Sequence, residues 1–354
     1  MVTLPLRTRL IRTRRAARPA STAQDTASPA KDAGKPKDKR VAALTRFAIS
    51  ITAFNIIGRL WLGFETSWAA LVLCLLTAYA CELLLESVDA ASHRRRPRYV
   101  GGVKQAVIFL LPAHIGATAI SMLIYPSEDL WPFAFASAVA VCSKYLIQAP
   151  INGRMRHVLN PSNVGISAVL LIFSWVGVGL PYQFTETTDG ILAWIIPLAV
   201  FSSGLMLNWK LTGKMPLVLG WAGGFALQAI LRGLDPSISV RGALAPMTGL
   251  AFLLFTTYMI TDPSTSPVRP RNQVIFGLAC AGGYAAFMIA HIVYGIFYSV
   301  VIVCAIRGTY HWVIYWRARR QRASSSPEPE VTMPAGQPAD ASSARPEPVR
   351  AERE

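Results

Sequence analysis

Charged residues are scarce in the middle of this chain, and their scarcity argues against a soluble globular domain. Only 15% of the 354 residues are charged, whereas 53% are hydrophobic. Apolar runs of about 20 residues recur between the two ends, which is the length needed to cross the ~30 Å hydrocarbon layer of a bilayer. A soluble domain would interleave charged residues at a helical or strand period. Residues 41–316 are therefore predicted to form an all-α polytopic membrane domain.

Other absences narrow the range of functions. The five cysteines form no C-x-x-C pair, which argues against a local zinc or iron–sulfur site, and no metal site is predicted. The chain has no P-loop, no Rossmann glycine fingerprint, no serine-hydrolase elbow and no H-E-x-x-H motif, so neither a hydrolase nor a nucleotide-driven pump is indicated. An apolar segment with a cleavage site does not precede the first span, and a cleaved signal peptide is not expected.

The net charge of +16 at first suggests nucleic-acid binding, but its placement argues otherwise. Basic residues precede the first span at 7–18 and 31–46, and follow the last span at 317–322. Basic flanks of this kind set membrane topology and contact anionic lipids, so the expected partner is the bilayer and not nucleic acid. Residues 1–40 and 317–354 contain few large apolar groups and are predicted to be disordered tails.

Ten membrane spans are predicted in the domain, and the loops between them alternate in charge. Lys and Arg stay on the cytoplasmic side, so an even number of spans places both termini in the cytoplasm. The membrane is expected to be the inner or plasma membrane of the cell. The expected spans are residues 41–63, 68–88, 104–125, 130–149, 162–180, 190–208, 215–232, 241–260, 273–290 and 294–316.

Two of these apolar regions are interrupted by nearly the same polar phrase. Asn160-Pro161-Ser162-Asn163 and Asp262-Pro263-Ser264-Thr265 lie 102 residues apart. Proline removes a backbone donor and disfavours helix in the preceding residue. Paired helix breaks at membrane depth point to a binding site in a polar pocket, because freed backbone groups are tolerated there only inside protein or beside water. The alternative is that both phrases are ordinary helix-end turns at the lipid surface.

Cations flank both phrases, which raises the possibility of an anion site. Arg156 precedes the first phrase, and Arg269 and Arg271 follow the second. Basic side chains beside free backbone donors form phosphate pockets, although the topology rule accounts for the same residues. The candidate cofactor-binding residues are Arg156, Asn160, Ser162, Asn163, Asp262, Ser264 and Thr265.

Several ionisable residues lie within the predicted spans. Glu82 and Glu86 share one helical face, and the deeper Glu82 is the candidate for an ion or proton pathway. Glu86 either faces the interior as well or lies at the cytoplasmic surface. Arg59 is expected to snorkel to the outer surface, and the alternative is an interior pairing with a carboxylate.

Two histidines are also of interest, because His114 lies within the third predicted span and His291 lies near the outer end of the ninth. A histidine from each of two helices could ligate haem, but a hydrogen-bonded helix histidine is the favoured interpretation.

The two phrases resemble motifs of a known family. Arg156 to Gly165 resembles the N-P-A-x-x-G region of the membrane subunits NqrB and RnfD, and Met259 to Ser266, with Gln273 to Gly277, resembles their M-x-T-D-P-x-S region. Those subunits belong to sodium-pumping quinone reductase and to Rnf complexes. The resemblance, which covers residues 41–316, implies about ten helices in two related halves, a flavin, and electron transfer through the membrane with partner subunits.

The chain resembles one branch more closely, the UnbU-type membrane proteins of enediyne antibiotic biosynthesis clusters in actinobacteria. The similar phrases are Arg46 to Thr52, Phe109 to His114, Pro181 to Glu186 and Ile260 to Pro263. This resemblance implies a role in enediyne natural-product biosynthesis.

One departure from the parent family concerns the flavin. NqrB and RnfD attach FMN through a phosphoester to the threonine of an S-G-A-T-like motif in an outward loop. The loop from Tyr182 to Gly190 contains Thr185, Thr187 and Thr188 but lacks this motif. Covalent flavin is therefore not expected, and FMN or riboflavin would bind non-covalently.

Two other functions remain open. Paired broken helices and Glu82 also suit a transporter or permease for an ion or a biosynthetic product. The two charged tails suit a scaffold that holds biosynthetic enzymes at the membrane.

Overall fold

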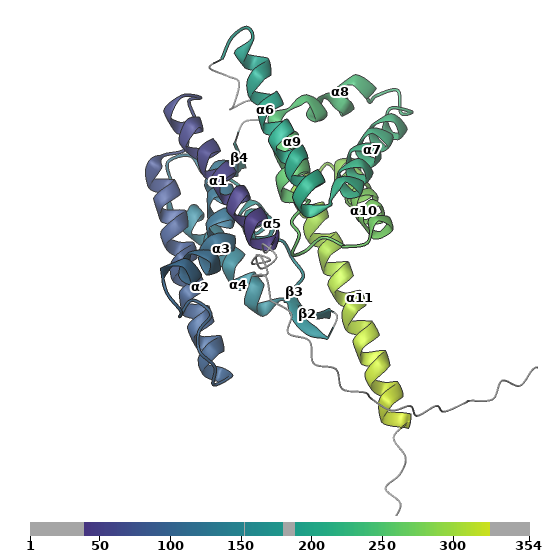
Figure 1. Cartoon of the computed structure of the whole chain (residues 1–354). Coiled ribbons are helices and arrows are strands. Elements are labelled where there is room, and N and C mark those ends of the chain that lie inside the picture. Colours follow the sequence, from purple (N-terminus) through teal and green to yellow (C-terminus); the bar gives the residue numbers. More distant parts are fainter. Residues whose placement is uncertain (1–38, 152, 180–187, 326–354) are drawn as a thin grey trace, which may run out of the picture. The chain divides into compact units, whose positions relative to one another are not determined.

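The computed structural model describes residues 39–151, 153–179 and 188–325, and these residues are mostly helical (Figure 1). The elements are, in chain order, α1 (Lys39–Leu60), α2 (Trp68–Ser92), α3 (Val103–Leu123), β1 (Ile124–Tyr125), α4 (Trp131–Leu146), β2 (Gln148–Ile151), β3 (Arg154–His157), α5 (Pro161–Ile172), β4 (Gly177–Val178), α6 (Leu192–Leu207), η1 (Asn208–Thr212), α7 (Met215–Arg232), α8 (Val240–Leu244), η2 (Ala245–Thr248), α9 (Leu250–Leu254), η3 (Phe255–Met259), α10 (Pro270–Ile289) and α11 (Gly295–Ser325). The η1 and η3 segments are π-helical.

Within the described ranges, seven helices are long and apolar enough to cross a membrane. They are α1, α2, α3, α6 continued by η1, α7, α10 and α11. The residues Val240–Thr248 and Phe252–Met259 form a pair bent by 68°, which adds an eighth span if the pair crosses as one unit. The predicted all-α polytopic class is confirmed, whereas the predicted count of ten spans is not.

The difference in count lies in α4 and α5, which replace two predicted spans. α4 has 16 residues and α5 has 12, both shorter than about 20. An antiparallel hairpin of β2 and β3 joins the two helices, and β1 pairs with β4 through Ile124 and Val178. Because β1 follows α3 and β4 follows α5, the chain leaves the end of α3 through α4 and returns to that end through α5.

The α4–α5 pair packs closely at Gly165. A Cβ at this position would lie 2.3 Å from the carbonyl oxygen of Ala136. Only glycine allows the two backbones to approach this far, as is common between membrane helices.

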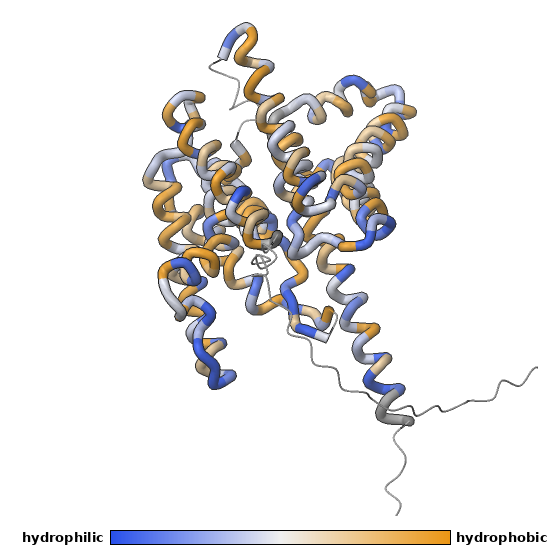
Figure 2. Tube along the Cα trace, in the orientation of Figure 1, coloured by the Kyte–Doolittle hydropathy of each residue, from blue (hydrophilic) through white to orange (hydrophobic). Residues whose placement is uncertain are grey.

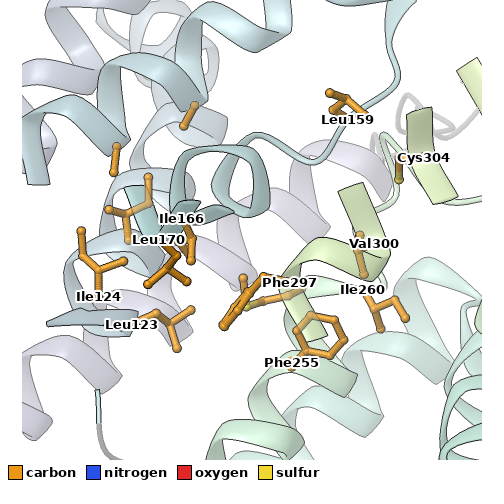
Figure 3. Packing of buried hydrophobic residues seen from close by; sticks show 14 of the residues in the cluster. Leu123, Ile124, Leu159, Ile166, Leu170, Phe255, Ile260, Phe297, Val300 and Cys304 are labelled. Carbon is orange, nitrogen blue, oxygen red and sulfur yellow. The ribbon is translucent and has the colours of Figure 1, made fainter. Parts of the chain in front are cut away.

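One buried apolar cluster joins elements from both parts of the chain. Ile166 of α5 lies near the end of α3, and Phe255 of η3 lies beside Phe297 of α11 (Figure 3). The middle parts of the helices are apolar, whereas the C-terminal end of α2, the β2–β3 hairpin and the C-terminal half of α11 are largely hydrophilic (Figure 2). The two helix breaks are therefore held by a core that spans α3, α5, η3 and α11.

The C-terminal helix is longer than the sequence predicts. α11 continues through Ser325, so residues 317–325 of the expected tail are helical. Trp312 of α11 donates its indole N–H to the carbonyl oxygen of Gln148 at 2.9 Å, which ties this helix to the hairpin. Residues 1–38 and 326–354 lie outside the described ranges.

Candidate functional site

The first helix break is a capped helix start. Asn160 is the N-cap of α5, and its Oδ1 accepts hydrogen bonds from the backbone N–H of Asn163 at 3.3 Å and from Ser162 Oγ at 2.8 Å. Pro161 occupies the first helical position, where its missing N–H would have had no partner in the helix. The phrase therefore begins α5 instead of disrupting a longer helix.

The second break has similar residues but a different structure. Asp262 closes a turn after η3, because its Oδ1 accepts from the N–H of Ser264 at 3.1 Å and its Oδ2 accepts from Thr265 Oγ1 at 2.9 Å. The Asp262 carbonyl accepts from the N–H of Ser266 at 3.0 Å. The next helix, α10, begins only at Pro270.

The two breaks contact each other directly. Asn160 donates from Nδ2 to the carbonyl oxygen of Met259, the last residue of η3, at 3.0 Å. Met259 carries one of the carbonyls freed where the helix ends, and the buried Asn160 satisfies it. Segments about 100 residues apart in sequence therefore form one polar junction, which we call the break junction (Asn160–Asn163 with Met259–Ser266).

Three backbone N–H groups of this junction are not free to bind a phosphate. The N–H groups of Asn163, Ser264 and Ser266 are already bonded to Asn160 or Asp262. Arg156 is exposed on β3. The role of Arg156 and the junction residues in cofactor binding therefore stays a prediction.

Two cations that the sequence analysis did not select bind the second break. Lys214 donates from Nζ to the carbonyl oxygens of Pro267 at 2.6 Å and Ser266 at 3.4 Å. Arg307 of α11 donates to the carbonyl oxygen of Thr265. Burial lowers the pKa of Lys214 from 10.5 to about 8, with Asp262 acting in the opposite direction. The signal for Arg307 was present in the sequence, since it is an isolated arginine inside an apolar span.

Asn163 stands out among the described residues because it is fully buried and unsatisfied. Neither Nδ2 nor Oδ1 of its amide has a hydrogen-bond partner, and Ser167 Oγ, one turn later on the same face of α5, also has none. An unpaired buried polar group costs about 1–3 kcal/mol. These atoms therefore mark a place where a polar ligand would recover lost hydrogen bonds.

Both glutamates of α2 are buried and paired. Glu82 accepts from Lys144 Nζ at 2.7 Å on each carboxylate oxygen and from the hydroxyl of Tyr145 at 3.2 Å. Glu86 accepts from Arg95 Nη1 at 2.5 Å and from the N–H of Arg98 at 2.8 Å. Glu86 thus combines both earlier interpretations, since it is buried but bonds to the basic run that follows α2.

Arg59 is held inside the protein instead of only snorkelling. It donates to Asn55 Oδ1 at 2.5 Å, to Thr66 Oγ1 at 3.0 Å and to the carbonyl oxygen of Ser121 at 3.1 Å. These partners are neutral oxygens, so the arginine bridges α1, α3 and the α1–α2 connection without a carboxylate.

The interpretation of His114 as a hydrogen-bonded histidine is confirmed. Its Nε2 lies 2.7 Å from Thr52 Oγ1, and its Nδ1 lies 2.6 Å from the hydroxyl of Tyr79. His291 is exposed in the turn after α10. With both nitrogens engaged, His114 has no free atom to ligate haem.

Two surface grooves lie along the C-terminal half of α11. One, of about 490 Å³, is lined by Val313, Trp316, Arg317 and Arg320. The other, of about 370 Å³, lies between α11 and the β2–β3 hairpin and includes Trp312 and Arg154. Neither groove includes a residue of the break junction.

The second break, its two cations and the helices around them lie in a segment with known relatives. Residues 173–309 match the model of the NQR2, RnfD, RnfE family. The match runs from the end of α5 into α11, and it supports the predicted NqrB/RnfD resemblance at the level of the family. Glu82 and Asn160 precede the matched segment. No curated protein matches the chain.

The loop expected to carry a covalent flavin in the relatives falls largely outside the described residues. Residues 180–187, which include Thr185 and Thr187, are not described. The resemblance to UnbU-type enediyne proteins likewise stays a prediction.

Proposed function

We propose that this membrane protein is a subunit of an electron-transport complex and binds FMN or riboflavin non-covalently at the break junction. The family match supports the electron-transport role. The observation that supports a bound cofactor is the buried amide of Asn163, whose donor and acceptor are both unsatisfied.

The donor and acceptor set of Asn163 suits one edge of a flavin ring. That edge presents carbonyl oxygens beside an N–H, and a side-chain amide offers one donor and one acceptor to match them. Asn163 and Ser167 would hold the ring edge, while Asn160 and Asp262 fix the backbone on either side. The flavin would supply the redox chemistry, and the protein would supply binding, orientation and electrostatics.

The N–H groups of Asn163, Ser264 and Ser266 are already bonded, which favours recognition of the ring over recognition of a phosphate. In this proposal the electron donor and acceptor are partner subunits or a quinone. The physiological setting that the UnbU-type resemblance suggests is enediyne biosynthesis.

The test is the absorption spectrum of the purified full-length protein. We expect flavin bands in the wild type, and denaturation should release all of the flavin because the attachment is not covalent. Asn163→Leu should lower bound flavin strongly. Chromatography of the released flavin would identify it as FMN or riboflavin.

A matched control is Gln228→Leu in α7, which also removes a buried amide with an unpartnered Nε2. It should leave the flavin content unchanged. A colourless wild type that takes up neither FMN nor riboflavin on reconstitution would refute the proposal. Equal loss of flavin in both variants would mean that Asn163 acts only through stability.

A transporter is the second candidate, and the bent α8–α9 pair favours it. Bent or re-entrant segments line substrate pathways in transporters, and this pair leads directly into the second break. Export of a biosynthetic product from cells should then fall in Glu82→Gln and Asp262→Asn. Export that persists in both variants would argue against transport.

We further propose that the protein lies in the inner or plasma membrane with both termini in the cytoplasm. The hydrophilic ends of α2 and α11 and the β2–β3 hairpin lie in the lower part of the view in Figure 2. Arginines occur in the segment that follows α2 (residues 94–98), in the hairpin (Arg154, Arg156) and at the end of α11 (Arg317, Arg319, Arg320). Lysine and arginine remain on the cytoplasmic side of membrane proteins. Cysteine labelling of engineered sites in each terminus, with a membrane-impermeant reagent, would test this orientation.

A further inference from the structure

A series of bonded polar side chains runs through the helices that precede the family-matched segment. Its middle level is a three-residue chain formed by Tyr79 of α2, His114 of α3 and Thr52 of α1. The Thr52 hydroxyl donates to the carbonyl oxygen of Ala48 at 2.7 Å. Thr52 therefore accepts from Nε2–H, and the Tyr79 hydroxyl donates to Nδ1, so the bonds determine the tautomer of the ring.

Toward the C-terminal end of α2, the series continues on the same helical face. Glu82 lies one turn after Tyr79 and binds Lys144 and Tyr145 of α4. Glu86 lies one turn further and binds Arg95 in the basic segment after α2. Polar groups thus extend from the centre of α2 to its hydrophilic end.

Toward the other end, the series continues between α1 and α3. Thr118 Oγ1 donates to the carbonyl oxygen of His114 at 2.8 Å, and Asn55 Nδ2 donates to the carbonyl oxygen of Thr118 at 3.2 Å. Ser121 Oγ donates to Asn55 Oδ1 at 3.1 Å, and Arg59 donates to the same oxygen. Arg59 lies in the last turn of α1, at the opposite end of the bundle from Glu86.

Most of these contacts link two helices or a helix and a loop, and together they follow one another along the length of the bundle. Polar and ionisable groups in a membrane are costly and commonly mark ion pathways and proton relays. Successive levels lie three or four residues apart along α1 and α2, a rise of about 4.5–6 Å along the helix axis, and a water molecule between two levels would connect them. The series also contains a histidine, the type of side chain whose ordinary pKa lies closest to neutral pH.

We propose that helices α1 to α4 form a proton pathway across the membrane, with His114 as its central relay. A proton moves from the Tyr79 hydroxyl to Nδ1, while the Tyr79 oxygen regains a proton from a water molecule on the Glu82 side. The Nε2 proton moves to Thr52 Oγ1, whose own proton passes to a water molecule on the Asn55 side once the hydroxyl has rotated. One proton is carried through, no heavy-atom bond changes, and rotation of the ring restores the first tautomer.

The experiment uses the full-length protein in liposomes under a potassium diffusion potential, with a trapped pH-sensitive dye. The wild type should show proton uptake above that of protein-free vesicles. His114→Phe should reduce uptake to the background of protein-free vesicles, and Tyr79→Phe, which removes only one hydroxyl, should slow it. A slower rate in D₂O should accompany wild-type uptake and be absent from His114→Phe.

The matched control is His291→Asn, at an exposed turn residue with a positive φ that asparagine tolerates. It should conduct like the wild type. Wild-type uptake equal to that of empty vesicles, or unchanged uptake in both His114→Phe and Tyr79→Phe, would overturn the proposal. The flavin content of the same samples is measured as well. A variant that loses proton uptake but keeps its flavin is impaired in the proton pathway and not in the proposed cofactor site.

Discussion

The buried cation beside Glu82 and the two buried cations beside the second break are held in two different ways. Among helices α1 to α4, Lys144 binds a buried carboxylate, that of Glu82. Among helices α6 to α11, Lys214 and Arg307 bind main-chain carbonyl oxygens of the turn after Asp262. In the first arrangement, opposite charges on two helices neutralise each other. In the second, cations donate hydrogen bonds to main-chain carbonyl oxygens that have no partner within a helix.

The difference explains how a non-helical segment survives inside an apolar bundle. Carbonyl groups released at a helix break cost several kcal/mol in hydrocarbon unless they find donors. At the first break, the cap residue Asn160 supplies the donors and acceptors itself. At the second break, donors come from other helices. The two parts should therefore respond differently when a cation is removed.

The largest expected effect is in the Glu82–Lys144 pair. Lys144→Met should destabilise the protein by about 3–5 kcal/mol, because it leaves a buried carboxylate without its counter-charge. The double variant Glu82→Leu, Lys144→Met should recover much of this loss. Thermal unfolding in detergent measures both, with the exposed Lys104→Met as the matched control. Additive losses in the double variant would show that the two residues do not act as a pair.

A smaller loss is expected when a carbonyl-bound cation is removed. Arg307→Met should cost about 1–3 kcal/mol, because it leaves the Thr265 carbonyl without this donor but leaves no unpaired charge. The exposed Arg317→Met is the matched control, and the same unfolding assay applies. An effect as large as that of Lys144→Met would remove the distinction between the two kinds of cation site.

The break junction itself should show an intermediate to small effect. Asn160→Ala removes both the α5 cap and the bond to Met259 and should cost about 1–2 kcal/mol. Asn160→Asp keeps the cap acceptor but cannot donate to Met259, so it should cost less. Proteolysis of the 158–163 and 259–266 segments in each variant would locate the loosening. Equal losses in the two variants would show that the cap contributes little.

The smallest expected effect, at most about 1.4 kcal/mol per pH unit, is a pH dependence from Lys214. Its folded-state pKa of about 8 lies below the 10.5 of the unfolded chain, so between these values the unfolded state binds more protons. Stability should therefore rise as pH increases above about 8. Unfolding temperatures measured across this range should show the rise in the wild type and a flatter profile in Lys214→Met. Parallel profiles would assign the pH dependence to another group.

Much of the architecture could be predicted from local pattern. Long apolar runs located α1, α2, α3, α6, α7, α10 and α11, because hydrocarbon thickness imposes a length on any helix that crosses it. Proline located both breaks. The shortening of α5 could not be predicted, since the short apolar stretch after it, residues 173–178, can by its composition form either helix or extended chain.

The candidate site was less predictable than the fold. Asn160, Asn163 and Asp262 were selected from their sequence context, and they do lie at the break junction. Arg156 was selected by proximity in sequence, but it lies on an exposed strand. Lys214 and Arg307 bind the second break from other elements, and their contacts depend on residues at least 42 positions away.

Local hydrophobicity and proline are enough to predict that this protein enters a membrane, roughly where its helices run and where they break. The pairing of the buried charges, the donors that reach the freed carbonyls and the unsatisfied amide of Asn163 become visible only once the helices are packed together. Those outcomes depend on contacts between helices that are far apart in sequence. A buried polar or charged group without a partner costs free energy in a low dielectric, so the packed helices place partners beside most of these groups.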